Sequence, residues 1–151
     1  MNINIRPLFV MNLVVNPMLV IGETPSGFRR VGVVTGGAFE GDRISGRVLD
    51  GSNDWQLVRN DGSTLLDVRL NLKTKEEELL TMSYRGIRHG PADVMKDIEA
   101  GIDVDPSRYY FRISPFFETA SKKYDWLNRV VAVGTGHRTP DGPVYSVFEV
   151  L

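Results

Sequence analysis

Segments in which apolar and polar residues alternate, as they do in β-strands, recur at short spacing along this chain. We expect strands over residues 6–21, 28–35, 43–50, 54–60, 64–73, 78–86, 108–114, 128–136 and 143–150. Two of the turns between them, Asn60-Asp61-Gly62 and Asp141-Gly142, favour tight hairpins, because glycine readily adopts the positive φ that such turns require. A chain with this pattern folds as a mostly antiparallel β protein.

One segment has the spacing of an α-helix, and it runs from Pro91 to Ala100. Pro91 suits the first helical turn and Gly101 the C-terminal cap, while one side of the segment is apolar, with Val94, Met95 and Ile98. A parallel βαβ sheet needs helices between most of its strands. We therefore predict an all-β fold, a single closed and mostly antiparallel barrel with one short helix near 91–100.

Composition limits the partners and the chemistry of the chain. Its 151 residues favour one domain, and 42% hydrophobic with 25% charged residues is ordinary for a globular protein. Lys and Arg number 18 against 19 Asp and Glu, so there is no basic excess to neutralise nucleic-acid phosphates. The absence of cysteine excludes a disulfide, a thiol nucleophile and a thiolate metal site. We expect a cytoplasmic protein that does not bind nucleic acid.

The apolar stretch over residues 7–21 has to be distinguished from a membrane or targeting segment. Asn12 and Asn16 interrupt it and Pro17 breaks it, so it is too short and too polar to span a bilayer. A single arginine precedes it, and no small-residue cleavage site follows. We expect one long first strand with a bulge at the proline, and no membrane partner.

The strand expected over residues 64–73 has one apolar face and one polar face. The two faces carry Leu66, Val68, Leu70 and Leu72 against Asp67, Arg69, Asn71 and Lys73. The next strand divides in the same way, with Thr81, Ser83 and Arg85 opposite Leu80, Met82 and Tyr84. In one interpretation the apolar row fills the core and the polar row meets solvent. In the other, polar residues line the lumen of a ligand-binding barrel, and the helix or a homodimer partner covers the apolar row.

Several motifs, in order over almost the whole chain, carry a family resemblance. They are Gly27-Phe28-Arg29-Arg30, Gly36-Gly37-Ala38-Phe39-Glu40-Gly41, Gly46-Arg47-Val48-Leu49, Asp54-Trp55, Leu66-Asp67-Val68-Arg69, the block from Tyr110-Phe111-Arg112 to Glu118-Thr119, and Trp126-Leu127-Asn128. With them the chain resembles the domain of unknown function 3237 family, also called uncharacterised protein family 0311. The resemblance implies a closed barrel of the calycin (lipocalin-like) type and no established substrate. Ser114 departs from the family pattern, in which we expect Arg-Thr after the aromatic motif.

The segment over residues 109–119 gathers aromatic side chains around one arginine. Tyr110 and Arg112 are two residues apart, so on a strand they share one side, opposite Tyr109, Phe111 and Ile113. We expect Tyr110 and Arg112 to face the barrel interior, with Asp67 or Glu40 within reach of the same cavity.

A buried arginine needs an anionic partner, because an unpaired charge is costly away from water. Arg112 would anchor an anionic or enolate oxygen of a ligand, since its guanidinium stays charged and offers forked donors. The alternative is a buried bridge from Arg112 to Glu118 or Asp67.

Three carboxylates are candidate general bases, and each has a structural alternative. Glu40, which lies among glycines, points into the barrel mouth or sits on the surface of a bend. Asp54 acts as a base inside the barrel or caps the turn before it. Asp67 serves as a base in a dry interior or forms a weak surface pair with Arg69.

Other aromatic and polar residues are candidates to hold a substrate. Trp55 is either core filling or a flat platform for an aromatic ligand. The substrate-binding set that we predict is Trp55, Arg69, Tyr84, Arg85, Glu118, Trp126 and Asn128. We expect no metal, because His89 and His137 lack the spacing of a zinc site. We expect no cofactor either, because Gly134-Thr135-Gly136 lacks the third glycine and the βαβ context of a dinucleotide site.

Two functional hypotheses of different classes follow. The first is a cofactor-independent enzyme, an isomerase, cyclase, dehydratase or other lyase, that transfers protons on a small aromatic or polyketide-like molecule. One carboxylate would be the base, and Arg112 with Tyr110 would stabilise the developing negative charge. The second is a protein that binds or carries such a molecule without changing it. The many ionisable residues favour the enzyme, since a carrier needs only a few orienting polar groups.

Overall fold

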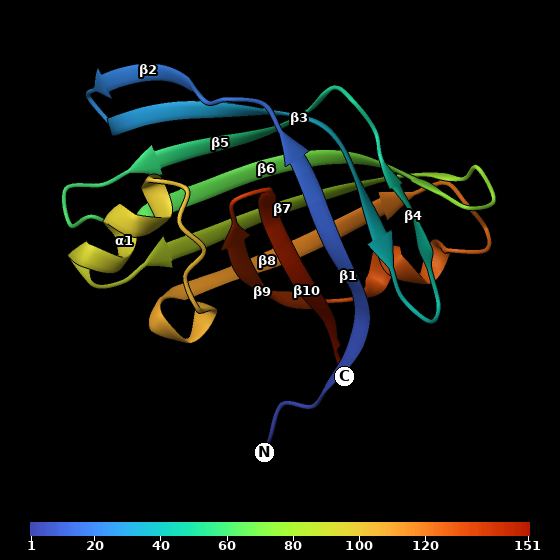
Figure 1. The fold of residues 1–151 in the computed structure, drawn as a ribbon. Helices are drawn as coiled ribbons and strands as arrows, with labels where there is room; N and C mark the ends of the chain where they lie inside the picture. Colours follow the sequence, from blue (N-terminus) through green and yellow to red (C-terminus); the bar gives the residue numbers. More distant parts are fainter.

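Ten strands make up most of the computed structural model, which describes residues 1–151 (Figure 1). They are β1 (Ile5–Val15), β2 (Leu19–Thr24), β3 (Gly27–Glu40), β4 (Ser45–Val48), β5 (Ser52–Val58), β6 (Thr64–Thr74), β7 (Leu79–His89), β8 (Tyr110–Thr119), β9 (Ala132–Thr139) and β10 (Gly142–Val150). The helical elements are α1 (Ala92–Glu99) and two 3₁₀ turns, η1 (Pro106–Arg108) and η2 (Asp125–Arg129). The predicted all-β fold with one short helix is confirmed.

All the strands belong to one antiparallel sheet that closes on itself. The order around the ring is β1, β10, β9, β8, β7, β6, β5 and β3, and β3 pairs back with β1. β4 and β5 both lie between β3 and β6, at different heights along the barrel. β5 pairs with residues 64–69 of β6, and β4 pairs with residues 72–74. β2 pairs with β3 alone. The predicted closed, antiparallel barrel is therefore confirmed.

The apolar N-terminal segment forms two strands, so the single long strand expected there is wrong. β1 ends at Val15, and the Asn16 amide still donates to the carbonyl of Val33 at 2.9 Å. Pro17 has no amide hydrogen with which to continue this ladder. β2 then begins at Leu19 and pairs with the opposite half of β3.

β3 extends beyond the segment predicted for it, and the extension closes the barrel. Residues 36–40 pair with β1 through the glycines Gly36 and Gly37. Gly37 has a φ of 138°, and a Cβ at this position would overlap the carbonyl oxygen of Asn12. Only glycine permits so close an approach of the two backbones at this seam.

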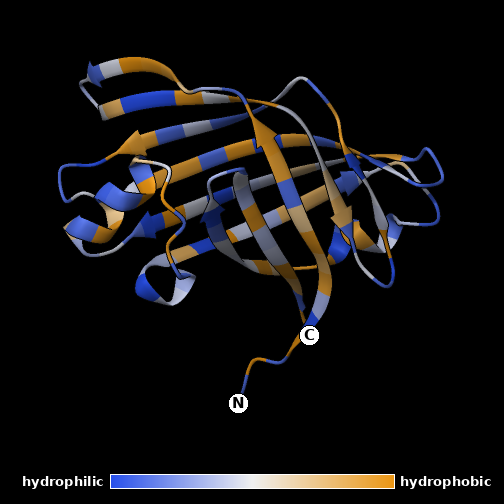
Figure 2. Ribbon diagram, viewed as in Figure 1, coloured by the Kyte–Doolittle hydropathy of each residue, from blue (hydrophilic) through white to orange (hydrophobic).

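Apolar side chains fill most of the barrel interior. The buried hydrophobic residues form one cluster of 27. Every second residue of β6 from Leu66 to Leu72 is buried, whereas Asp67 and Arg69 between them are exposed. Hydrophobic and hydrophilic colours alternate along β6 in Figure 2. The interpretation with an apolar interior is therefore right for β6. Each fully buried leucine contributes about 1.5–3 kcal/mol to folding.

Helix α1 covers one end of the barrel, beside the ends of β5 and β7 (Figure 1). Val94 and Ile98 are buried in the core cluster, and Met95 packs partly against it, as the apolar stripe predicts. Gly101 follows the helix with a φ of 80°, the left-handed conformation that commonly ends helices. No helix of the structure combines the length and the apolar character needed to cross a membrane.

Candidate functional site

A group of polar side chains lies inside the barrel, at the end that α1 covers. Strand alternation puts them there, because Asp54 and Gln56 share the buried face of β5, and Tyr84 and Arg88 share that of β7. Residues of β3, α1 and β10 complete the group. We call it the inner cluster, and it consists of Arg30, Asp54, Gln56, Tyr84, Arg88, Glu99 and Tyr145.

A chain of hydrogen bonds connects the inner cluster to α1. Both terminal nitrogens of Arg30 donate to the Glu99 carboxylate, at 2.7 and 2.8 Å. Arg30 Nε donates to Gln56 Oε1 at 2.8 Å, and Gln56 Nε2 donates to Asp54 Oδ2 at 2.8 Å. Arg88 approaches Glu99 at 3.8 Å. The geometry of Asp54 therefore depends on residues from β3, β5, β7 and the helix.

Asp54 is the most deeply buried carboxylate of the cluster, with 4% of its surface exposed. Burial raises the pKa of Asp54 above its ordinary value, and the hydrogen bond from Gln56 and the charges of the nearby arginines oppose this rise only in part. Its Oδ1 atom is buried and has no hydrogen-bond partner in the protein. A buried carboxyl group with a raised pKa and a free oxygen suits the exchange of a proton with a ligand.

Two tyrosine hydroxyls and one arginine nitrogen near Asp54 are also buried without protein partners. The rings of Tyr84 and Tyr145 lie 5.4 Å apart, edge to face, and both hydroxyl groups are unpartnered. Burial raises the pKa of Tyr84, and burial with the charge of Asp54 raises the pKa of Tyr145, so both remain neutral donors. Nε of Arg88 is the fourth such atom. Buried polar atoms are normally paired, so their concentration at one place marks a candidate functional site.

Arg88 keeps its positive charge inside the cluster although it is only 3% exposed. Burial lowers the pKa of its guanidinium, and the charge of Arg30 acts in the same direction. The aromatic ring of Phe111 lies under the Arg88 guanidinium, at 5.3 Å. The cluster thus offers a fixed cation beside neutral hydroxyl groups and one buried carboxyl.

A cavity of about 340 Å³ leads toward the inner cluster from the side of α1. It lies between the helix and the starts of β3 and β6, and is lined by Phe28, Arg30, Val58, Gly62, Thr64, Met95, Lys96 and Glu99. Arg30 and Glu99 belong both to this cavity and to the cluster. Arg30 connects the cavity lining to Asp54 through the hydrogen bonds of Gln56.

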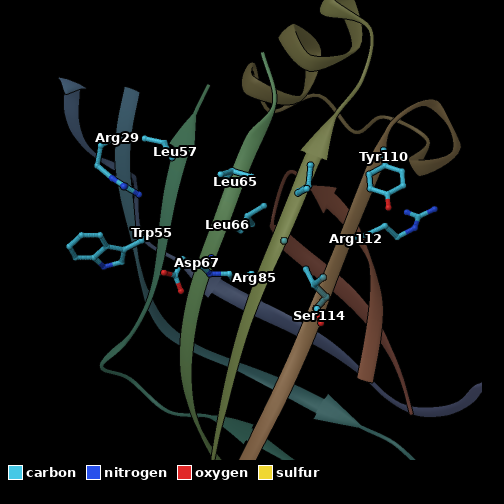
Figure 3. A pocket seen from close by; sticks show the side chains of 13 residues that line it. Arg29, Trp55, Leu57, Leu65, Leu66, Asp67, Arg85, Tyr110, Arg112 and Ser114 are labelled. Carbon is cyan, nitrogen blue, oxygen red and sulfur yellow. The ribbon is translucent and has the colours of Figure 1, made fainter. Parts of the chain in front are cut away.

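A second and larger concave region lies on the outer face of the barrel, over β3, β5, β6, β7 and β8 (Figure 3). We call it the outer hollow; its volume is about 580 Å³, and it is lined by Arg29, Trp55, Leu57, Leu65, Leu66, Asp67, Arg85, Gly86, Ile87, Tyr110, Arg112, Ile113 and Ser114. Five residues of the predicted site thus meet here, namely Trp55, Asp67, Arg85, Tyr110 and Arg112.

The expectation that Tyr110 and Arg112 face the barrel interior is wrong. Tyr110 is 45% exposed and Arg112 is exposed, whereas Phe111 and Ile113 are buried. The alternation was predicted correctly, but the apolar pair occupies the interior because it joins the hydrophobic core. Arg112 forms no bridge to a carboxylate; its Nη1 donates to the backbone oxygen of Phe111 at 2.9 Å, and its guanidinium lies 4.8 Å from the Tyr110 ring.

The remaining predicted residues divide among several places. Asp54 and Tyr84 lie in the inner cluster. Glu40 is exposed at the end of β3, 3.5 Å from Lys75, as the surface alternative expects.

Besides Glu40, four predicted residues lie away from both regions. Arg69 and Glu118 are exposed on the outer face, at another concave region. Asn128 holds the end of β8 through two hydrogen bonds with the backbone of Thr119, at 2.8 and 2.9 Å. Trp126 packs partly against the core, with Arg43 at 4.6 Å from its ring.

Sequence reasoning missed most of the inner cluster, namely Arg30, Gln56, Arg88, Glu99 and Tyr145. Alternation could have found two of them, since Gln56 is two residues from Asp54 and Arg88 is four from Tyr84. No local pattern connects Glu99 with Arg30, which lie 69 residues apart.

The structure contains no group of three or more His, Cys, Asp or Glu side chains that could hold a metal ion. His137 bonds Asp103 at 2.9 Å, and His89 stacks on Tyr110 with 5.1 Å between ring centroids.

The sequence matches one family over nearly its whole length. The family is described as "protein of unknown function (DUF3237)", and the match covers residues 3–150. A UPF0311 protein of Rhodopseudomonas palustris is 35% identical over 130 residues, which are 86% of this chain and 85% of that protein. A UPF0311 protein of Bradyrhizobium diazoefficiens is 31% identical over 144 residues, 95% of this chain and 94% of the relative.

Solved structures share the barrel. A β-barrel-like protein from Acinetobacter baumannii has a TM-score of 0.87 and 38% identity, over 99% of this chain and 97% of the other. A protein of unknown function from Rhodopseudomonas palustris has a TM-score of 0.96 and 31% identity, over 99% of both chains. An enzyme from Penicillium herquei has a TM-score of 0.75 and 19% identity, over 99% of this chain and 95% of the enzyme. At that identity the last likeness shows the fold alone.

Proposed function

The chain belongs to the DUF3237 (UPF0311) family, and we propose that it is a cofactor-independent enzyme that transfers protons on a small organic molecule. The observation that carries the proposal is the inner cluster, where buried Asp54 has a raised pKa and a free oxygen. Structural ion pairs also shift pKa values, but they do not leave four polar atoms buried without partners.

Asp54 is the proton acceptor in this proposal. Its carboxylate removes a proton from carbon next to a carbonyl group, and the electron pair of the broken C–H bond moves onto the carbonyl oxygen. In an isomerase Asp54 then returns the proton to the far carbon of a conjugated dienolate, as the carbonyl group re-forms. In a dehydratase the enolate electrons form a double bond between the α and β carbons, the bond from the β carbon to its hydroxyl group breaks, and the proton from Asp54 converts the departing hydroxide to water. One well-placed base contributes about 10²–10⁴-fold to the rate of such a step.

Arg88 and the two tyrosines would stabilise the oxygen that becomes negative. The Arg88 guanidinium is buried, so its charge acts through a medium of low dielectric constant. Tyr84 and Tyr145 have raised pKa values and are therefore neutral donors, and neither hydroxyl group has a hydrogen-bond partner in the protein. These groups suit an enolate better than an alcohol or an amine.

The surroundings favour a planar, partly apolar substrate. Tyr145 contacts both Tyr84 and Phe111, with ring centroids 5.4 Å apart in each pair. Aromatic edges and faces of this kind pack well against another aromatic ring. The Arg30–Glu99 pair lines the cavity beside α1, and its arginine would also attract an anionic group on the substrate. An aromatic or polyketide-like ketone combines these properties.

The test is deuterium exchange, in D₂O, of enolisable ketones that contain an aromatic ring, followed by proton NMR. Suitable probes are 2-tetralone, which is neutral, and 4-oxo-4-phenylbutanoate, which carries a carboxylate. We expect the protein to accelerate loss of the α-proton signal, and Asp54→Asn to reduce the acceleration by about 10²–10⁴-fold. Asp125→Asn, which changes an exposed carboxylate of η2 outside both regions, is the matched control and should keep the wild-type rate.

Full activity of a folded Asp54→Asn variant would refute the role of the inner cluster. Broadening of the probe signals without any accelerated exchange would favour the alternative hypothesis, a protein that binds or carries the molecule unchanged.

A further inference from the structure

We propose that the outer hollow is a separate binding site for a small planar aromatic carboxylate. Its volume of about 580 Å³ lies within the range of about 300–1,000 Å³ usual for small-molecule pockets. The site is distinct from the inner cluster, because the same strands present alternate residues to the two regions. Arg29 and Trp55 face the hollow, whereas their neighbours Arg30 and Asp54 face the interior.

The hollow carries an excess of positive charge. Arg29, Arg85 and Arg112 line it, against a single carboxylate, that of Asp67. The ion pairs of the chain involve other arginines, namely Arg6, Arg30, Arg43, Arg47, Arg59, Arg88, Arg108 and Arg129. Asp67 is opposite Arg85 in the strand register, yet the two form no ion pair. Arg29 and Arg112 each donate once to a backbone oxygen, at 3.5 and 2.9 Å, and their other guanidinium donors, with those of Arg85, remain to bind a carboxylate group.

Aromatic side chains hold two of these arginines in place at opposite sides of the hollow. The guanidinium of Arg29 lies 5.8 Å from the Trp55 ring, and that of Arg112 lies 4.8 Å from the Tyr110 ring. Figure 3 shows these two pairs apart, with Asp67 and Arg85 between them. Because stacking on a ring restricts a guanidinium, less conformational entropy is lost when an anion binds.

The rest of the lining suits a flat apolar body. Trp55 is 49% exposed and Ile87 is 39% exposed, and Leu57 and Leu65 lie beside them. Large exposed apolar groups around a concave region commonly mark a binding surface. An aromatic ring can cover these groups while its carboxylate reaches an arginine.

Charge argues against a second copy of the chain as the occupant. Two copies that met at this face around a two-fold axis would bring the same patch together, and with it the arginines of both copies. Like charges brought together at an interface oppose association. A small anion, by contrast, is attracted by the arginines that line the hollow.

The experiment is a titration of ¹⁵N-labelled protein with 2-naphthoate, followed through the N–H signals of the tryptophan and arginine side chains. We expect saturable shifts of the Trp55, Arg85 and Arg112 signals and none for Trp126, the other tryptophan, which packs elsewhere beside Arg43. Arg85→Gln should weaken binding by about tenfold, the loss of one charged hydrogen bond. Arg47→Gln, a paired arginine of β4, and the neutral 2-naphthalenemethanol are the controls.

Asp54→Asn should leave these shifts unchanged, so the result does not depend on the activity of the inner cluster. Equal binding of the naphthoate and the neutral alcohol, or no effect of Arg85→Gln, would overturn the proposal. A dimer at these concentrations that Arg85→Glu dissociates would assign the hollow to a second copy instead, and would also overturn it.

Discussion

Replacement of Asp54 by asparagine should stabilise the protein, and the gain should grow as the pH rises. The substitution removes the charge but keeps a carbonyl oxygen that accepts the 2.8 Å hydrogen bond from Gln56 Nε2. The wild-type carboxyl is buried, and burial raises its pKa in the folded state. The unfolded chain has no such burial, so the cost of ionising Asp54 falls on the folded state alone.

The sign and the magnitude follow from proton linkage. Between the ordinary pKa of 3.8 and the raised value in the folded protein, the folded state binds more protons than the unfolded state. Wild-type stability therefore falls as the pH rises through this window, by up to about 1.4 kcal/mol per pH unit from this one group. Below the window Asp54 has no such effect, and above it the cost is constant. The variant lacks this dependence.

The measurement is the free energy of unfolding in urea for wild type and Asp54→Asn, at half-unit intervals from pH 3.5 to pH 8. The difference between the two proteins isolates Asp54, because every other titrating group is present in both. Asp67→Asn, on the opposite face of the sheet, controls for the loss of one negative charge. A difference that does not change with pH would refute the reasoning. If the variant instead became less stable than wild type as the pH rises, Arg88 and Arg30 would be holding the Asp54 carboxylate in its charged form.

Two further predictions test the connection to α1 and the closure of the barrel. Glu99→Gln should destabilise the protein by about 1–2 kcal/mol, because it removes the carboxylate that pairs with Arg30 and Arg88. The loss is limited because the Glu99 side chain is 48% exposed. Glu77→Gln, whose ion pairs with Arg47 and Lys73 are more exposed, should cost less in the same denaturation experiment, and an equal loss would contradict the prediction. Gly37→Ala should lower the free energy of unfolding by more than about 1 kcal/mol, because the φ of 138° and the contact with Asn12 both exclude a Cβ. Gly36→Ala, next to open space, is its control, and equal melting temperatures for the two variants would show that the seam can relax.

The alternation of residue types was enough to predict the barrel and its helix. Leu66 to Leu72 at every second position could only form a strand with one buried face, and that face joins the core. Gly101 and Pro91 bracket the single helix where the sequence places it. Two errors in the strand pattern stand out. At Pro17 a break in the ladder resembles a bulge until the pairing partner is known. The strand expected over residues 128–136 begins only at Ala132, because residues 128–129 belong to the 3₁₀ turn η2.

Where both faces of a strand carry large side chains, the sequence does not determine which face points inward. In β8 the pairs Tyr110–Arg112 and Phe111–Ile113 are both bulky, and a period of two cannot choose between them. The choice depends on the other strands, since Phe111 fits inside only because Gly136 of β9 leaves room for its ring.

The inner cluster was decided by tertiary structure alone. Its residues come from β3, β5, β7, α1 and β10, and the Arg30–Glu99 hydrogen bond spans 69 residues. Each of these side chains is ordinary in its own segment, and the pKa of Asp54 rises only because closure of the barrel removes it from water. The amino-acid sequence therefore determined the strands and the residues that share a face, while closure of the ring determined which polar groups lie together in the dry interior.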